Sequence, residues 1–142
     1  MIIRKAYLLV FSLLALVGCK KELSSAPTQS TPVTTSTGLP GTWELASATN
    51  GNTGRLTTYP AGNGQLFVFT TNTYQTFTSG SLVKSGTYTL AQQFSIVQKQ
   101  MVNTIIFDRD TSLINIIYLN GNQLSLSIDG YDTPSVSYTR IK

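Results

Sequence analysis

The stretch "SLINIIYLNGNQLSLSI", residues 112–128, carries the pattern that decides the fold. Its second half alternates strictly between polar and apolar residues, which is the period of a β-strand with one face against a core. Its first half is rich in isoleucine, and Asn120-Gly121-Asn122 between the halves tolerates the positive φ angles of a tight hairpin. The stretch therefore predicts two antiparallel strands, 112–119 and 123–128.

Strand-like runs with the same character continue on both sides of this hairpin, and no stretch after residue 41 has a convincing helical period. The runs lie at 42–49, 65–70, 73–79, 81–90, 104–108 and 135–141, with a weaker one at 93–98. Turns are expected at 71–72, 79–80 and 109–110. Short antiparallel strands joined in this way indicate an all-β up-and-down barrel or a sandwich.

Alternation on the last two strands predicts which side chains face the core. The inner set is Leu124, Leu126, Ile128, Val136, Tyr138 and Arg140. Arg140 is the anomaly in this set, because a charged side chain is expected to face water.

Arg140 is explained when it is considered together with Gly41-Thr42-Trp43 at the start of the first strand. This pair of motifs resembles the lipocalins, and more closely the small lipocalin-like lipoproteins common in Bacteroidetes. The resemblance implies a single antiparallel up-and-down barrel of about eight strands, closed at one end by Trp43 with Arg140 across its indole face. Such a cation–π contact stabilises by about 0.5–2 kcal/mol. The alternative is that Gly-x-Trp merely marks a strand start in another β-sandwich.

Shorter segments extend the resemblance over most of residues 41–142. They are Phe69-Thr70 with Tyr74, "SGTYTL" at 85–90 and "LSIDGYD" at 126–132. In a meander barrel, the last strand ends beside Trp43 only if the number of strands is even. We therefore exclude 93–98 from the barrel. The same geometry places the glycine-rich loop 50–64 at the opposite, open end, where it is expected to act as a mobile lid.

The N-terminal segment, residues 1–18, is typical of a secretory signal peptide. Arg4 and Lys5 precede an apolar run at 6–17, which is shorter than the roughly 17–25 residues that span a bilayer. Leu16-Val17-Gly18-Cys19 then resembles the lipobox of bacterial lipoproteins. This implies that Cys19 becomes the mature N-terminus and carries a diacylglycerol. The alternative is a signal peptide with an incidental cysteine.

Residues 19–40 are expected to tether the lipid anchor to a barrel domain at 41–142. The tether is rich in serine, threonine and proline and buries too little apolar surface to order itself. The anchor implies attachment to a bacterial outer membrane, at its periplasmic face or at the cell surface. Lys20-Lys21-Glu22 weakly resembles the charged surface-export signals of Bacteroidetes lipoproteins.

Composition excludes several classes of function for the domain. Residues 41–142 hold six basic and five acidic side chains, so the domain lacks the positive charge that nucleic acid requires. The chain has no histidine, and its single cysteine is the predicted acylation site. We therefore expect no enzyme, no cofactor and no metal. Calcium at Asp108 and Asp110, or at Asp129 and Asp132, is less favoured than turn formation.

A small apolar ligand in the barrel is the remaining prediction from the sequence. The candidate wall residues are Phe67, Phe69, Tyr74, Tyr88, Ile116 and Tyr118. Core packing is the alternative role for each of them. The predicted function is a lipid-anchored, lipocalin-like ligand carrier. The alternative is a surface module that binds a protein or glycan through its loops or through exposed rows such as Thr87 and Thr89.

Overall fold

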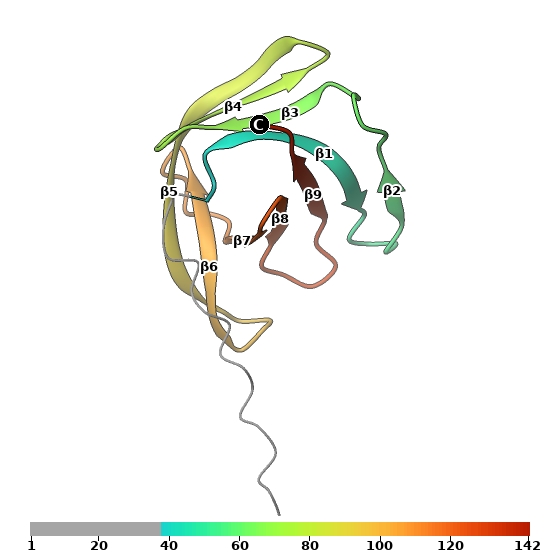
Figure 1. Cartoon of the computed structure of the whole chain (residues 1–142). Coiled ribbons are helices and arrows are strands. Elements are labelled where there is room, and N and C mark those ends of the chain that lie inside the picture. The colour runs from blue at the N-terminus through green and yellow to red at the C-terminus, as the bar shows by residue number, and fades with distance from the viewer. Residues whose placement is uncertain (1–37) are drawn as a thin grey trace, which may run out of the picture. The chain divides into compact units, whose positions relative to one another are not determined.

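A computed structural model describes residues 38–142 of the protein, so the predicted signal peptide, Cys19 and most of the expected tether lie outside the described residues. Nine strands form one sheet in the order β2-β1-β3-β4-β5-β6-β7-β8-β9, and β1 also pairs with β9. The result is a closed eight-strand antiparallel up-and-down barrel with one extra strand, β2 (Figure 1). The predicted all-β barrel is confirmed.

The strands are β1 (Gly41–Thr49), β2 (Leu56–Thr58), β3 (Gln65–Phe69), β4 (Thr73–Thr78), β5 (Ser81–Ser95), β6 (Gln100–Phe107), β7 (Asn115–Asn120), β8 (Gln123–Ile128) and β9 (Ser135–Arg140). Each barrel strand except β5 overlaps one predicted strand. In residues 38–142 no helix is long and apolar enough to cross a membrane.

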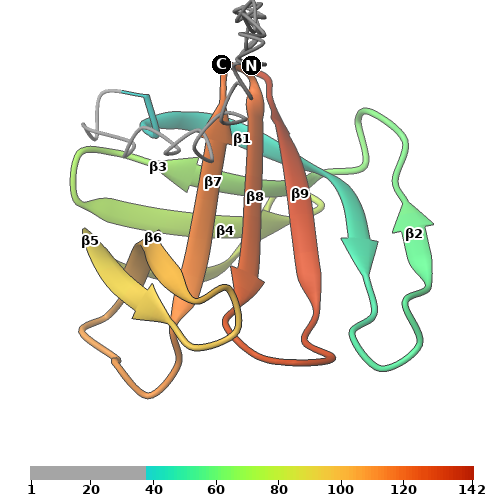
Figure 2. The same cartoon turned by 90° about the horizontal axis from the view of Figure 1, so that it is seen from below.

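The extra strand β2 comes from the loop that the sequence predicted to be a lid. It pairs with the second half of β1, through Ser47, Ala48 and Thr49, where β3 no longer does. Its three residues are exposed, and it extends the sheet beside β1 instead of covering the interior (Figure 2). The Glu44 carboxylate, which is only 8% exposed, accepts hydrogen bonds from the amides of Gly62 and Gly64. The lid prediction is therefore wrong.

Strand β5 is a single strand where the sequence predicted two. It pairs with β4 up to Thr87 and with β6 from Tyr88 onward, so 93–95 belongs to the end of β5 and 96–99 forms the turn to β6. Strand β6 then meets β7 at two register positions only, Thr104 with Ile116 and Ile105 with Asn115. The far half of the β5–β6 hairpin consequently diverges from β7.

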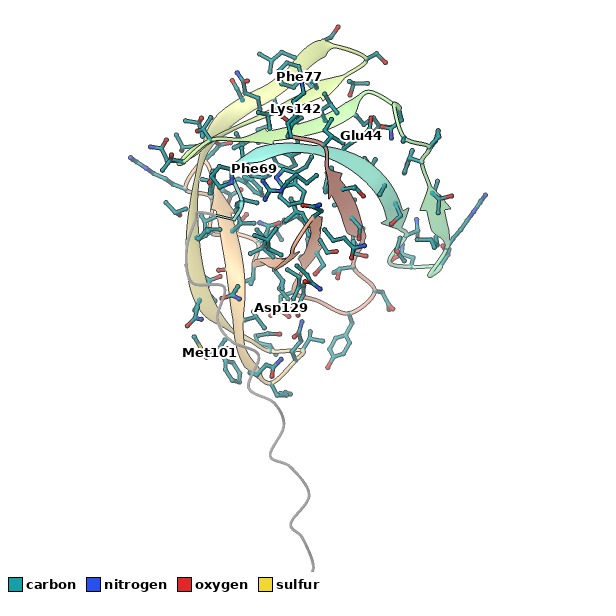
Figure 3. All side chains as sticks on the ribbon, viewed as in Figure 1. Glu44, Phe69, Phe77, Met101, Asp129 and Lys142 are labelled. Atoms are coloured by element: carbon teal, nitrogen blue, oxygen red, sulfur yellow. The ribbon has the colours of Figure 1, made fainter. Side chains whose placement is uncertain are left out.

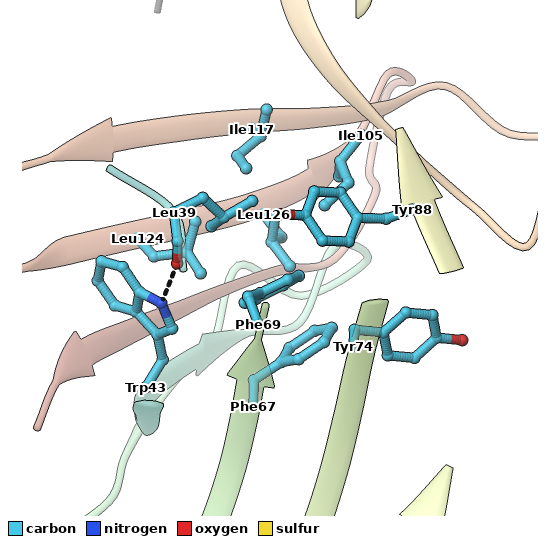
Figure 4. Close-up of a cluster of buried hydrophobic side chains, with 10 residues drawn as sticks. All are labelled: Leu39, Trp43, Phe67, Phe69, Tyr74, Tyr88, Ile105, Ile117, Leu124 and Leu126. Carbon is cyan, nitrogen blue, oxygen red and sulfur yellow. Dashed lines mark hydrogen bonds between the residues drawn. The ribbon is translucent and has the colours of Figure 1, made fainter. Parts of the chain in front are cut away.

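The core is an aromatic and aliphatic cluster inside the barrel (Figure 4). Its members are Leu39, Trp43, Phe67, Phe69, Tyr74, Tyr88, Ile105, Ile117, Leu124 and Leu126. Leu39 is 1% exposed, although the sequence analysis assigned it to the tether. The ordered domain thus includes residues before Gly41, and a leucine that looked like part of a linker packs as core.

Candidate functional site

The closed end of the barrel is built around the indole of Trp43, which is fully buried. Its Nε1 donates a hydrogen bond of 2.9 Å to the carbonyl of Leu39. The Cζ of Arg140 lies 4.2 Å from the centroid of the indole ring. Arg140 also donates from Nη1 to the Pro40 carbonyl at 2.8 Å and from Nη2 to the Gly38 carbonyl. One guanidinium therefore covers the indole ring and also donates hydrogen bonds to two backbone carbonyls of the segment that crosses this end of the barrel.

The register of β1 and β9 explains why these two residues meet. Trp43 and Arg140 are directly opposite each other on the paired strands, so their side chains leave the sheet on the same face. A Cβ at Gly41 would lie 2.6 Å from both Nη1 of Arg140 and the carbonyl oxygen of Lys142. The glycine of Gly-x-Trp is thus required by this close approach. Trp43, Arg140 and the chain at residues 38–41 therefore form a packed closure.

Four of the six predicted wall residues come together in the interior. The rings of Phe67 and Phe69 stack at 4.2 Å, Tyr88 meets Phe69 edge-on at 5.3 Å, and Tyr74 meets Phe67 edge-on at 5.6 Å. All four side chains are at most 7% exposed. Burial raises the pKa of Tyr88, whose hydroxyl donates to the Thr70 carbonyl at 2.7 Å. These residues pack against one another as core.

The other two predicted wall residues lie on the opposite face of β7. Ile116 is buried outside the core cluster, and Tyr118 is 49% exposed and donates to Gln98 Oε1 at 3.0 Å. Ile117, between them, belongs to the cluster. The predicted face was off by one residue, because the run 116–119 has no polar residue that marks its register.

A polar cluster connects the buried Tyr74 of β4 with Lys84 and Thr87 of β5 and with Asp108, directly after β6. The Tyr74 hydroxyl donates to Asp108 at 2.7 Å, Lys84 Nζ lies 3.1 Å from the same carboxylate, and the Thr87 amide donates to it at 3.0 Å. The hydrogen bonds from Tyr74 and Lys84 lower the pKa of Asp108, and burial raises the pKa of Tyr74. Asp110 instead accepts from the Ser112 amide. The two carboxylates thus stabilise a turn.

A second polar contact ties the β5–β6 hairpin to the loop that follows β8. Ser95, fully buried, donates to Asp129 Oδ1 at 2.6 Å and accepts from the Gln98 amide at 2.8 Å. The Ile96 amide donates to Asp129 Oδ2 at 3.1 Å. From the sequence, Asp129 was considered as a turn residue or, less favoured, as a calcium ligand with Asp132, because nothing local connects it to a serine 34 positions away. No group of three or more metal-ligating side chains occurs in residues 38–142.

An apolar groove of about 220 Å³ lies beside the loop that follows β8, at the end of the barrel opposite Trp43, which we call the open end. It is lined by Asn115, Leu126, Ser127, Ile128, Pro134, Ser135 and Val136. Leu126 belongs to the core cluster and Val136 packs against it, so the floor of the groove is the core itself. Ile128 shares the face of Leu126, two residues earlier on β8.

A second, more polar groove adjoins the first. It has a volume of about 560 Å³ and is lined by Ala48, Thr49, Asn50, Thr53, Arg55 and Thr57. Ala48 is the register partner of Val136, which connects the two grooves across β1 and β9. The open end therefore offers an apolar floor beside a hydroxyl-rich wall with a cationic residue.

No protein-family model matches this chain, and neither a curated protein nor a solved structure is significantly similar to it.

Proposed function

We propose that this protein is a lipid-anchored, lipocalin-like binding protein of the bacterial envelope that holds a small apolar ligand at the open end of its barrel. The observation that carries the proposal is the groove over Leu126, Ile128 and Val136, where apolar core side chains meet solvent. The deep interior is occupied by the aromatic cluster, so the ligand lies at the mouth. This differs from the sequence prediction, which placed it among Phe67, Phe69 and their neighbours.

The size and lining of the groove define the ligand class. Pockets for drug-sized molecules are typically about 300–1,000 Å³, whereas the apolar groove has about 220 Å³. It fits a single short acyl chain or one ring system. Polar atoms at the rim come from Asn115, and the adjoining groove adds the side chains of Thr53, Arg55 and Thr57. An amphiphile with an apolar tail and a polar head matches this pair of surfaces.

Binding without catalysis is the reading that the available side chains support. Histidine is absent from the sequence, and the single cysteine is the predicted acylation site. The Ser95 hydroxyl is fully buried and donates to the Asp129 carboxylate, so it is not exposed to a substrate. The tyrosine hydroxyls of the core donate to a carboxylate or a carbonyl inside the fold.

Titration with a fluorescent medium-chain fatty acid tests the ligand site. We expect saturable binding to the mature chain, and at least about tenfold weaker binding by Ile128→Glu, because a carboxylate in the groove must lose its hydration when the tail enters. Val136→Phe fills the groove without adding charge and is expected to weaken binding as well. Leu82→Glu, on an exposed residue of β5, is the matched control and should bind normally.

Thermal unfolding of all three variants shows whether the fold is retained. Absence of binding by the unmodified chain would refute the ligand site. Equal losses in Ile128→Glu and Leu82→Glu would also refute it.

Metabolic labelling with palmitate tests the anchor. Label should enter the protein and be lost in Cys19→Ser, since Cys19 is the sole cysteine. Labelling that survives this substitution would overturn the anchor without affecting the groove.

A further inference from the structure

Several large apolar side chains are exposed to solvent at the tip of the β5–β6 hairpin. Phe94 and Met101 are each 55% exposed and sit directly opposite each other on β5 and β6. Such a cross-strand pair lies on one face with its side chains in contact range. Ile96, in the adjoining turn, is 67% exposed. The hairpin thus ends in a protruding apolar edge where it has left β7.

Tyr131 brings a fourth large exposed side chain to the same end of the barrel. It is 77% exposed, and it lies two residues after Asp129, which holds Ser95 and Ile96. Met101 and Asp129 lie on the same side of the molecule, far from Lys142 (Figure 3). Single exposed apolar residues are ordinary on a protein surface, but a cluster contributed by two segments marks an interaction site. We name Phe94, Ile96, Met101 and Tyr131 the apolar tip.

The charges around the apolar tip are suited to a lipid surface. Lys99 is exposed in the turn of the hairpin, and no acidic residue occurs in the sequence between Glu44 and Asp108. The Asp129 carboxylate is already hydrogen-bonded to the hairpin. The backbone carbonyl of Asp132 packs against Gly51. Aromatic and aliphatic side chains beside a lysine are the composition of membrane-interface segments.

We infer that the apolar tip docks on a lipid bilayer, with Phe94, Ile96 and Met101 inserted at the level of the headgroups and Tyr131 at the edge of the contact. The apolar groove lies next to this surface, because Ile128 immediately precedes Asp129 and Pro134 closes the same loop. Docking therefore faces the groove toward the membrane. The inference rests on the proposed function and names its ligand class: the acyl chain of a membrane lipid.

The attachment point of the domain permits this orientation. Gly38 enters at the closed end, bonded to Arg140, whereas the apolar tip is at the open end. Residues 19–37 can reach at most about 60 Å when fully extended, at roughly 3.3 Å per residue. The six-residue strands β7 to β9 span only about 20 Å. An anchor at Cys19 therefore leaves enough chain for the open end to contact the bilayer that holds it.

Vesicle co-sedimentation tests the docking surface separately from the anchor. The mature chain, residues 19–142 with Cys19→Ser, has no acyl group and is mixed with vesicles of phosphatidylethanolamine and phosphatidylglycerol. We expect it to bind. Phe94→Ser/Ile96→Ser should reduce partitioning by about tenfold or more, since it removes two apolar side chains from the inserted surface. Leu82→Ser/Val83→Ser removes two exposed apolar residues from another hairpin and should bind normally.

The fatty-acid titration on the same variants separates the two proposals. Phe94→Ser/Ile96→Ser should keep its affinity for the fatty acid in solution. A chain that binds the fatty acid but no vesicles would overturn the docking surface and leave the groove intact, and the reverse result would overturn the groove alone. Equal losses in the two double variants would also overturn the docking surface. So would a dimer in solution that dissociates in Phe94→Ser/Ile96→Ser, because the tip would then belong to a second copy.

Discussion

The two ends of the barrel differ in how much apolar surface they leave exposed to solvent. At the closed end, Trp43 and Arg140 satisfy the carbonyls of residues 38–40, and apolar surface is covered by Leu39. At the open end, one serine–aspartate contact holds the hairpin, while apolar side chains of the groove and the tip meet solvent. We therefore expect the closed end, where polar groups are enclosed, to contribute most to stability. We expect the open end, where apolar groups are uncovered, to bind ligands.

The polar groups of both ends are nevertheless satisfied within the protein. Among residues 38–142, no buried side-chain nitrogen or oxygen lacks a hydrogen-bond partner. What distinguishes the ends is therefore the apolar surface they leave in water. Substitutions at the closed end should lower stability, and those at the open end should mainly change binding.

Trp43→Ala should have the largest effect. The indole is fully buried in the core cluster, and removing a buried tryptophan typically costs about 3–5 kcal/mol in the free energy of unfolding. Denaturant unfolding measures the loss. Tyr131→Ala at the open end is the matched aromatic control and should stay within about 0.5 kcal/mol of the unmodified protein. Comparable losses at Trp43 and Tyr131 would contradict the division between the ends.

Arg140→Met should be the next most damaging change. Methionine keeps an apolar stem over the indole but leaves the carbonyls of Gly38 and Pro40 without their donor. Hydrogen bonds to a charged group contribute about 1.5–3 kcal/mol, and we expect a loss in that range. Arg140→Lys should recover only part of it, because an ammonium lacks the planar fork. The exposed Arg109→Met is the control, and an equal effect there would rule out the closure role.

Ser95→Ala should cost about 1.5 kcal/mol, the low end for a hydrogen bond to a charged group, since it removes the hydroxyl that donates to the Asp129 carboxylate and accepts from the Gln98 amide. The effect should be local: hydrogen exchange of the Ile96 and Gln98 amides accelerates, whereas the Trp43 indole proton stays protected. Faster exchange at Trp43 as well would show that the two ends unfold together, which would contradict a difference in stability between them.

Asp108→Asn should have the smallest effect, and a dependence on pH identifies it. The pKa of Asp108 is lowered in the folded state, chiefly by the Tyr74 hydroxyl, so its contribution is fully present above the ordinary value of 3.8 and is lost as the pH falls through the folded pKa. The unfolding temperature of the variant should therefore be lower at neutral pH and converge with that of the unmodified protein in acid. A difference independent of pH would assign the effect to packing.

The strand pattern was readable because it depends on neighbours in sequence. The 120–122 turn and the alternation of Leu124 and Leu126 specify their hairpin locally, and the positions of all eight barrel strands were predicted in this way. Trp43 and Arg140 were singled out by their resemblance to a family pattern. Strand β2 was missed, since it is only three residues long, lies within a glycine-rich loop and is held by the edge of β1.

The candidate site was less predictable, because it depends on long-range pairing. The inner face of 116–119 was assigned one residue off, and Leu39 looked like part of the tether. The Ser95–Asp129 contact, the apolar groove and the apolar tip all combine segments that are distant in sequence.

By itself, the sequence determined an all-β meander and the positions of its strands, because period and turn chemistry act over a few residues. The count of eight barrel strands and the closure by Trp43 came from the resemblance to a family. Only the tertiary structure decided which aromatic side chains fill the interior, where the core meets solvent and which hairpin protrudes. The physical reason is closure: pairing β1 with β9 and curving β5 from β4 to β6 sets which faces are enclosed, and neither depends on local sequence.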